Sequence, residues 1–130
     1  MTDPALEAAL ARAKRIHLTT FSASGKSGTV PVWFMRKDGR LYFTTGRASL
    51  KARRIAATGR VRVHVGAADG PGFDGTARLI DDRPDLEREI LAAYRRKYPL
   101  VVPLFMGWFI RRRLARKENV VVEITPGVRL

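Results

Sequence analysis

The chain has 130 residues, of which 45% are hydrophobic and 28% charged, a composition typical of one globular domain over residues 1–130. It contains no cysteine, which excludes disulfide bonds, thiolate metal sites and cysteine nucleophiles. Twenty-five basic residues and twelve acidic ones give a net charge of +13. Such a surface favours an anionic ligand: nucleic acid, anionic lipid or a phosphorylated small molecule.

The first third of the chain predicts a helix followed by β-hairpins. Asp3 and Pro4 are a capping residue and a first-turn proline, and good helix formers continue to Lys14. Runs rich in β-branched and aromatic residues follow at 16–22, 29–35 and 40–45, joined by short turns, which predicts antiparallel neighbours. Pro31 places the second run at a sheet edge or a bulge.

The remaining segments alternate between strands and helices. The pattern predicts helices at 48–58, 81–97 and about 101–115, and strands at 60–65, 73–80 and 119–125. Strands joined by short turns outnumber the helices and come first. This order predicts a mainly β (α+β) fold, an antiparallel barrel of about six strands with three or four helices packed outside.

No segment of the sequence is typical of export or of a membrane span. The N-terminal fifteen residues contain Asp3 and Glu7 and lack the apolar run of a secretory signal, so we expect a cytoplasmic protein. The longest uncharged run, 98–110, is shorter than the roughly 20 residues that a span requires. We interpret the apolar segment 100–117 as a helix packed on the barrel or at a dimer interface. The alternatives are a lid over the active site and a helix that contacts a membrane surface, which is not favoured.

Residues 44–54 contain the strongest indication of a ligand site. A strand ends in two hydroxyl side chains, a glycine loop follows, and a helix begins; the polar residues here are Thr44, Thr45, Ser49 and Lys51. The bases Arg47, Lys51 and Arg54 have the spacing of one helical face. Free N–H groups at a helix start favour anions, so we expect a phosphate site; a solvated basic face is the alternative. The Walker pattern is absent.

Other chemistry-bearing residues give weaker indications. His17 and His64 lack acidic residues at ligand spacing, so no metal site is expected. Trp33 is expected either near a cofactor or in the core. No side chain stands out as a catalytic acid, base or nucleophile.

Five runs in this order resemble the pyridoxamine 5′-phosphate oxidase-like split β-barrels, and more narrowly the small actinobacterial flavin and deazaflavin oxidoreductases. They are HLTTF at 17–21, VPVWF at 30–34, LYFTT at 41–45, SxKxxRI at 49–55 and RVRV at 60–63. The resemblance extends from Ala13 to Pro126. It implies a six-stranded split barrel that forms a homodimer and binds its cofactor in a groove at the dimer interface.

The resemblance also implies which residues bind the cofactor. Residues along the ring, largely through backbone groups, would be Val30, Pro31, Val32 and Trp33. Residues around the phosphate would be Thr44, Thr45, Ser49, Lys51 and, as a weaker match, Arg54. The sequence departs from some relatives at Leu50, where they carry a phosphate-binding arginine.

The net charge bears on the choice of cofactor. Coenzyme F420 carries a phosphate and a glutamate chain, so it is more anionic than FMN, and we expect F420 with FMN as the alternative. The expected function is hydride transfer to a small-molecule substrate, for which the protein supplies orientation and electrostatics. A non-catalytic cofactor or polyanion binder is the rival. A nucleic-acid partner is not expected, because the basic block 36–64 lacks interleaved stacking aromatics.

Overall fold

The computed structural model describes residues 3–97, 112 and 118–130. Three helices and seven strands lie in this part of the chain. In order they are α1 (Pro4–Arg12), β1 (Ile16–Phe21), β2 (Ser27–Val32), β3 (Met35–Lys37), β4 (Arg40–Gly46), α2 (Leu50–Thr58), β5 (Arg60–Val65), β6 (Gly72–Ile80), α3 (Pro84–Lys97) and β7 (Asn119–Arg129). The helix expected around 101–115, and with it the proposed lid, dimer or membrane segment, lies outside the described residues except for residue 112.

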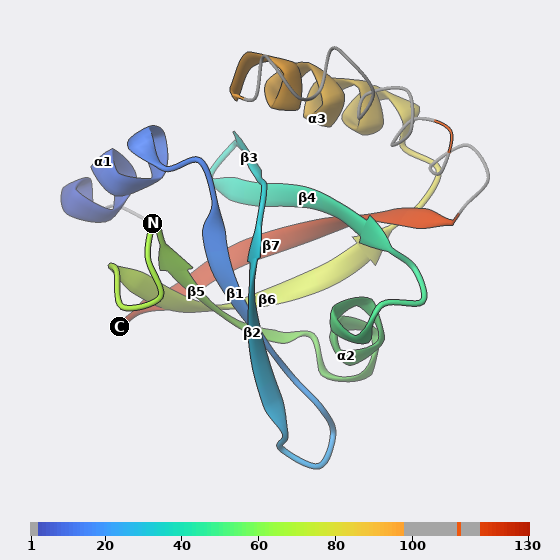
Figure 1. Cartoon of the computed structure of the whole chain (residues 1–130), viewed down its shortest axis with the longest axis horizontal. Coiled ribbons are helices and arrows are strands. Elements are labelled where there is room, and N and C mark those ends of the chain that lie inside the picture. The colour runs from blue at the N-terminus through green and yellow to red at the C-terminus, as the bar shows by residue number, and fades with distance from the viewer. Residues whose placement is uncertain (1–2, 98–111, 113–117) are drawn as a thin grey trace.

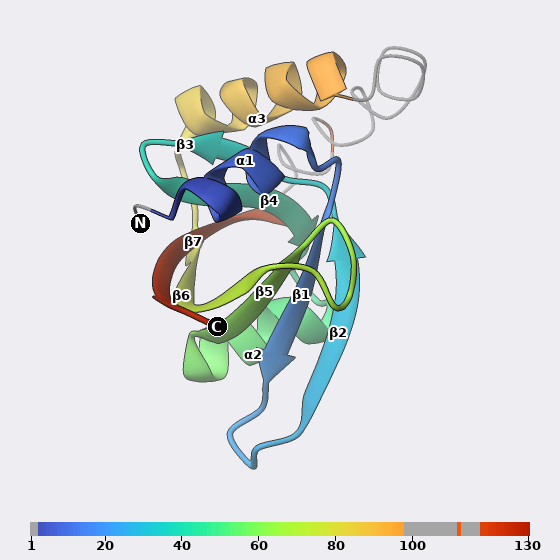
Figure 2. The same ribbon diagram turned by 90° about the vertical axis from the view of Figure 1, so that its left-hand side faces the viewer.

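The seven strands form one antiparallel sheet in the order β2-β1-β5-β6-β7-β4-β3 (Figure 1). The two edge strands, β2 and β3, are joined through Trp33 and Phe34 alone. Two fully extended residues add only about 7 Å to the length of the chain. The sheet must therefore curl until its two edge strands approach one another. Figure 2 shows this curl from the side. The expected mainly β barrel, open along one seam, is confirmed.

The expectation of six strands is wrong, because the run 29–35 is two strands. Val32 pairs with Ile16 of β1, whereas Met35 pairs with Tyr42 of β4. Those two partners belong to opposite ends of the sheet, so Trp33 and Phe34 have to leave one edge and cross to the other. The edge position indicated by Pro31 is confirmed, since among residues 3–97, 112 and 118–130 β2 has a neighbouring strand on one side only.

The main core fills the inside of the curled sheet. Along β5 the alternation is regular, with Val61, Val63 and Val65 buried and the residues between them partly exposed. Leu6 and Leu10 of α1 and Ile55 of α2 complete the same cluster from its ends. A second cluster lies between α3 and the outer face of the sheet around β3, β4 and β7, as the position of α3 in Figure 1 indicates.

Local signals place the helices as the sequence suggested. Asp3 caps α1, its Oδ1 accepting from the backbone nitrogen of Leu6 at 3.1 Å, and Pro4 opens the first turn. Helix α2 ends at Gly59, whose φ of 67° favours glycine at a helix C-terminus. Within the described residues, no helix has the length and apolar character needed to cross a membrane.

Candidate functional site

The end of β4 and the start of α2 are joined through two hydroxyl groups. Ser49 is the N-cap of α2, and its Oγ accepts from the backbone nitrogen of Ala52 at 3.2 Å. The same Oγ lies 3.2 Å from Oγ1 of Thr45, which is buried at the end of β4. The Thr45–Ser49 pair therefore fixes the position of the helix N-terminus, whose first N–H groups lack partners within the helix.

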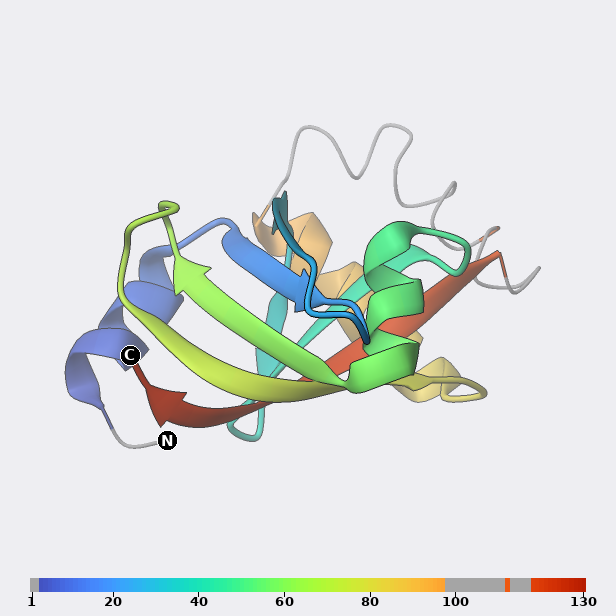
Figure 3. The ribbon, with the colours of Figure 1, turned by 90° about the horizontal axis from the view of Figure 1, so that it is seen from below.

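One flank of α2 faces the β1–β2 hairpin. Lys51, Arg54 and Thr58 share this flank by their spacing of three and four residues. The Thr58 hydroxyl donates to the carbonyl oxygen of Phe21 at 2.9 Å, which attaches the helix to the end of β1. Nη1 of Arg54 lies 3.1 Å from the point that a β-carbon on Gly28 of β2 would occupy. Figure 3 shows the hairpin beside α2.

The two bases on this flank lack acidic partners among the described residues. Nε of Arg54 is buried and forms no hydrogen bond with any of these residues. Lys51 is half-buried, and burial lowers the pKa of its ammonium group below the ordinary value. In the part of the chain that the structure describes, neither forms an ion pair, whereas seven other bases do. Buried charges are normally paired, so this arrangement is suited to an anion supplied by a ligand.

The facing wall is the strand β2, which is exposed over almost all of its length. Val30 is 41% exposed although its neighbour in register, Leu18 of β1, is fully buried. Gly28, Val30 and Val32 alternate onto one face of the strand, the face that Arg54 contacts at Gly28. An exposed apolar strand face beside two unpaired bases suits a ligand with a flat apolar part and an anionic end.

The structure divides the expected ring-contacting residues. Val30 and Val32 share the face that includes Gly28, whereas Pro31 alternates onto the opposite face of β2. Trp33 lies beyond the end of the strand, in the connection to β3. Its indole ring contacts Tyr94 edge-on, with the ring centroids 5.5 Å apart and an angle of 83° between the planes. Trp33 is partly buried and packs against the cluster beneath α3, outside the main core of the barrel.

The expected phosphate residues are brought together only in part. Thr45, Ser49, Lys51 and Arg54 all lie at α2 or contact it. The Thr44 side chain alternates onto the face of β4 opposite to Thr45, so it does not join the hydroxyl pair.

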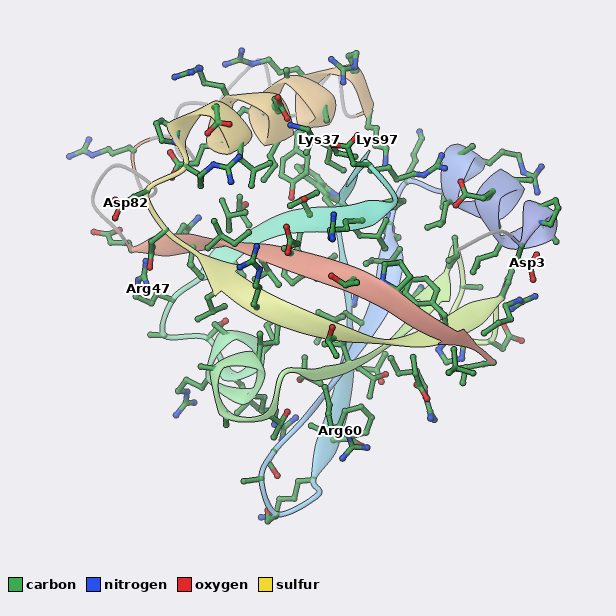
Figure 4. The ribbon with its side chains drawn as sticks, turned by 180° about the vertical axis from the view of Figure 1, so that it is seen from behind. Asp3, Lys37, Arg47, Arg60, Asp82 and Lys97 are labelled. Atoms are coloured by element: carbon green, nitrogen blue, oxygen red, sulfur yellow. The ribbon has the colours of Figure 1, made fainter. Side chains whose placement is uncertain are left out.

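Arg47 does not belong to the basic face of the helix, and that expectation is wrong. Ser49 caps the helix, which therefore starts at Leu50, and Arg47 precedes it. Its guanidinium donates to both oxygens of Asp81 at 2.5 and 3.3 Å. Figure 4 shows Arg47 close to Asp82, in the connection from β6 to α3. The basic face consequently contains two residues rather than three.

Sequence reasoning missed Gly28 and Tyr94 as residues of this region. Gly28 belonged to an expected turn, and Tyr94 to the apolar face of an expected helix. Neither the turn nor the helix pattern indicates a site, because Gly28 and Tyr94 acquire their roles through contacts between distant segments.

His17 and His64 are directly opposite one another on β1 and β5. No group of three or more histidine and acidic side chains among the described residues is arranged to hold a metal ion.

Comparison with known proteins gives one family and several similar folds. The family model described as Pyridoxamine 5′-phosphate oxidase matches residues 2–127. No curated protein matches the chain. The heme storage protein HutZ from Vibrio cholerae has 14% identity and a TM-score of 0.71, over 98% of this chain and 94% of HutZ.

Two further solved structures have a similar fold. An F420 reductase has 22% identity and a TM-score of 0.65, over 95% of this chain and 94% of its own. General Stress Protein 26 from Bacillus anthracis has 20% identity and a TM-score of 0.65, over 92% of this chain and 84% of its own. At these identities the likeness shows a shared fold, on which storage proteins and reductases both occur.

Proposed function

The chain belongs to the pyridoxamine 5′-phosphate oxidase family, and from that premise we propose that it is an oxidoreductase that uses the deazaflavin coenzyme F420 to transfer a hydride to a small-molecule substrate. One observation carries the proposal. The buried Nε of Arg54 has no hydrogen-bond partner in the described part of the chain, and it lies beside an exposed apolar strand face and the half-buried Lys51. This pairing of an unsatisfied cationic group with an apolar surface suits a ring system joined to a phosphate.

Each residue of the site has a separate role in this proposal. Lys51 and Arg54 would bind the phosphate, together with the N–H groups that Ser49 leaves available at the start of α2. Gly28 would leave the space that the Arg54 guanidinium occupies, and Val30 would contact the ring. When bound, the cofactor supplies the hydride chemistry. The contribution of this chain is to bind and orient it and to shield one side of the ring from water.

The surrounding charge favours F420 over FMN. Arg53 on α2 is exposed and forms no ion pair with any described residue, so it remains available to a ligand that extends beyond the phosphate. Only F420 continues into a chain of carboxylates. FMN-dependent oxidation and reduction on the same site is the alternative, because its phosphate and flavin ring would use the same two walls.

The open seam supports a homodimer as part of the proposal. The residues of β2 are exposed on both faces, and the outer edge of this strand pairs with no other described strand. A second copy covering β2 would bury Val30 and would close the groove over the cofactor. Light scattering should therefore give about twice the mass of one chain at micromolar concentration. A monomer at that concentration would contradict this part.

The experiment that tests the proposed function is retention of a cofactor. The purified protein is incubated with F420, FMN or heme in turn, desalted, and examined by absorbance. We expect F420 to be retained in stoichiometric amount, FMN less completely, and heme in trace amount. Retention of FMN in preference to F420 would select the alternative. Retention of heme alone would instead support the rival, a non-catalytic cofactor binder; HutZ, which has a similar fold, is described as a heme storage protein.

A further inference from the structure

Tyr94 of α3 connects two backbone groups that lie on either side of the open seam. Its side chain is buried, and its Oη lies 3.3 Å from the backbone nitrogen of Thr44 and 3.4 Å from the carbonyl oxygen of Trp33. A phenol hydroxyl can accept one hydrogen bond and donate another. It therefore accepts from Thr44 and donates to Trp33, while its ring packs edge-on against the indole.

The strand pairing explains why this position has a side-chain partner. β3 pairs with β4 only as far as Tyr42, so Thr44 lies beyond the end of that pairing. β2 pairs with β1 only as far as Val32, so Trp33 lies beyond that end as well. Backbone groups that are partly buried and lie beyond the end of a strand pairing need another partner, and the Tyr94 hydroxyl supplies one for both.

The two contacted residues lead directly into the two walls of the candidate site. Trp33 follows the strand whose exposed face includes Val30. Thr44 precedes Thr45, whose hydroxyl contacts the Ser49 cap of α2. A hydroxyl that holds Trp33 and Thr44 together holds the β2 wall and the β4–α2 wall at a set separation.

We propose that Tyr94 is a positioning residue that sets the separation between β2 and the β4–α2 connection, the two segments that would contact the cofactor. This inference rests on the proposed function. Helix α2, which would bind the phosphate, is held in place by other contacts, namely the Ser49 cap and the hydrogen bond from Thr58 to Phe21. Loss of the Tyr94 hydroxyl should therefore weaken binding of a ligand that contains the ring, and leave binding of an anion alone unchanged.

The test is Tyr94→Phe, which keeps the aromatic ring and removes only the hydroxyl. Tyr42→Phe is the matched control, because Tyr42 is also buried, lies on the same strand as Thr44, and donates to Glu123 at 2.9 Å. Dissociation constants for F420 and FMN are measured by titration, and inorganic phosphate is titrated as a competitor. We expect Tyr94→Phe to bind both cofactors about five- to tenfold more weakly, the loss of roughly one hydrogen bond's contribution. Its phosphate affinity and the cofactor affinities of Tyr42→Phe should stay within about twofold of the wild type.

A second measurement reports on the geometry without any cofactor. Hydrogen exchange at the Thr44 amide should be faster in Tyr94→Phe and unchanged in Tyr42→Phe, with thermal melting to confirm that both variants are folded. Equal cofactor affinity in Tyr94→Phe and the wild type would overturn the inference and leave the proposed function standing. An equal loss in both variants, or a parallel loss of phosphate binding, would also overturn it. A wild type that binds neither F420 nor FMN would overturn the proposed function as well.

Discussion

The guanidinium of Arg54 lies directly against Gly28, with Nη1 3.1 Å from the point that a β-carbon on that glycine would occupy. The contact joins helix α2 to the edge strand β2, two segments separated by a turn, two strands and a loop. It also holds Arg54 where its buried Nε forms no hydrogen bond with the part of the chain that the structure describes. The position of this base in the site therefore depends on the absence of a side chain 26 residues earlier in the sequence.

Gly28→Ala should weaken anion binding while the protein stays folded. The new methyl group would meet only the end of a flexible side chain, so the fold loses little, but the guanidinium has to shift. An off-rotamer arginine costs about 0.5–1.5 kcal/mol, which corresponds to a loss of about 2- to 12-fold in affinity for cofactor or phosphate. Isothermal titration calorimetry of the variant and the wild type measures this change in affinity. Ser27→Ala, on the other face of the same strand, is the control and should bind normally.

Lys51→Met should reduce cofactor affinity by much more than it reduces stability. A charge-assisted hydrogen bond to phosphate contributes about 1.5–3 kcal/mol, or about 10- to 150-fold in the dissociation constant. Removing a half-buried ammonium that forms no ion pair with a described residue should leave the melting temperature unchanged or slightly higher. Arg53→Met removes the same charge from an exposed position two residues away, and the comparison is made with FMN, which lacks the carboxylate tail proposed to contact Arg53. If both variants lost affinity equally, the effect would be one of net charge and Lys51 would not contact the phosphate.

The preference for F420 over FMN should decrease as salt is added. Exposed contacts between carboxylates of the F420 tail and bases such as Arg53 contribute about 0.2–1 kcal/mol each. Two of them would give F420 an advantage of about tenfold at low ionic strength. The Debye length decreases from about 10 Å at 0.1 M salt to about 3 Å at 1 M salt. Most of the advantage of F420 should therefore disappear at 1 M salt. Titrations of F420 and FMN at the two salt concentrations measure this preference. A preference that does not change with salt would contradict the proposal that these bases bind the F420 tail.

Lys97 should make the free energy of unfolding depend on pH in the alkaline range. Burial and the nearby Arg36 lower its pKa to about 8, although its Nζ donates to the Phe34 carbonyl at 2.9 Å and lies over that ring. With a folded pKa below the unfolded value of 10.5, the unfolded state binds more protons between these values. The contribution of Lys97 to the free energy of unfolding therefore rises as pH increases from about 8 to 10.5.

Urea denaturation of the wild type and of Lys97→Met at pH 7.5 and pH 10 isolates this contribution. The difference between the two proteins cancels other titrating groups, among them Tyr42, whose pKa is raised by burial and by its bond to Glu123. We expect the wild type to gain stability relative to Lys97→Met at the higher pH. A constant difference would mean that Lys97 titrates at its ordinary pKa in the folded protein.

Local signals in the sequence determined most of the elements. Asp3 and Pro4 marked the start of α1, the alternation at 60–65 marked β5, and the bases and hydroxyls at 44–54 marked the candidate anion site. These features depend on residues within a few positions of one another, so backbone geometry and side-chain periodicity suffice to read them. The family resemblance added the curled sheet to this local information.

The tertiary structure decided which of those residues meet. The run 29–35 is apolar and extended throughout, and only the pairing of its two halves with opposite sheet edges divides it into β2 and β3. Arg47 has the helical spacing of a site residue, yet Asp81 neutralises it from a segment 34 positions away. Gly28 and Tyr94 enter the site region through contacts across 26 and 50 residues. Contacts between distant segments depend on how the whole sheet curls, which no local pattern of residues encodes.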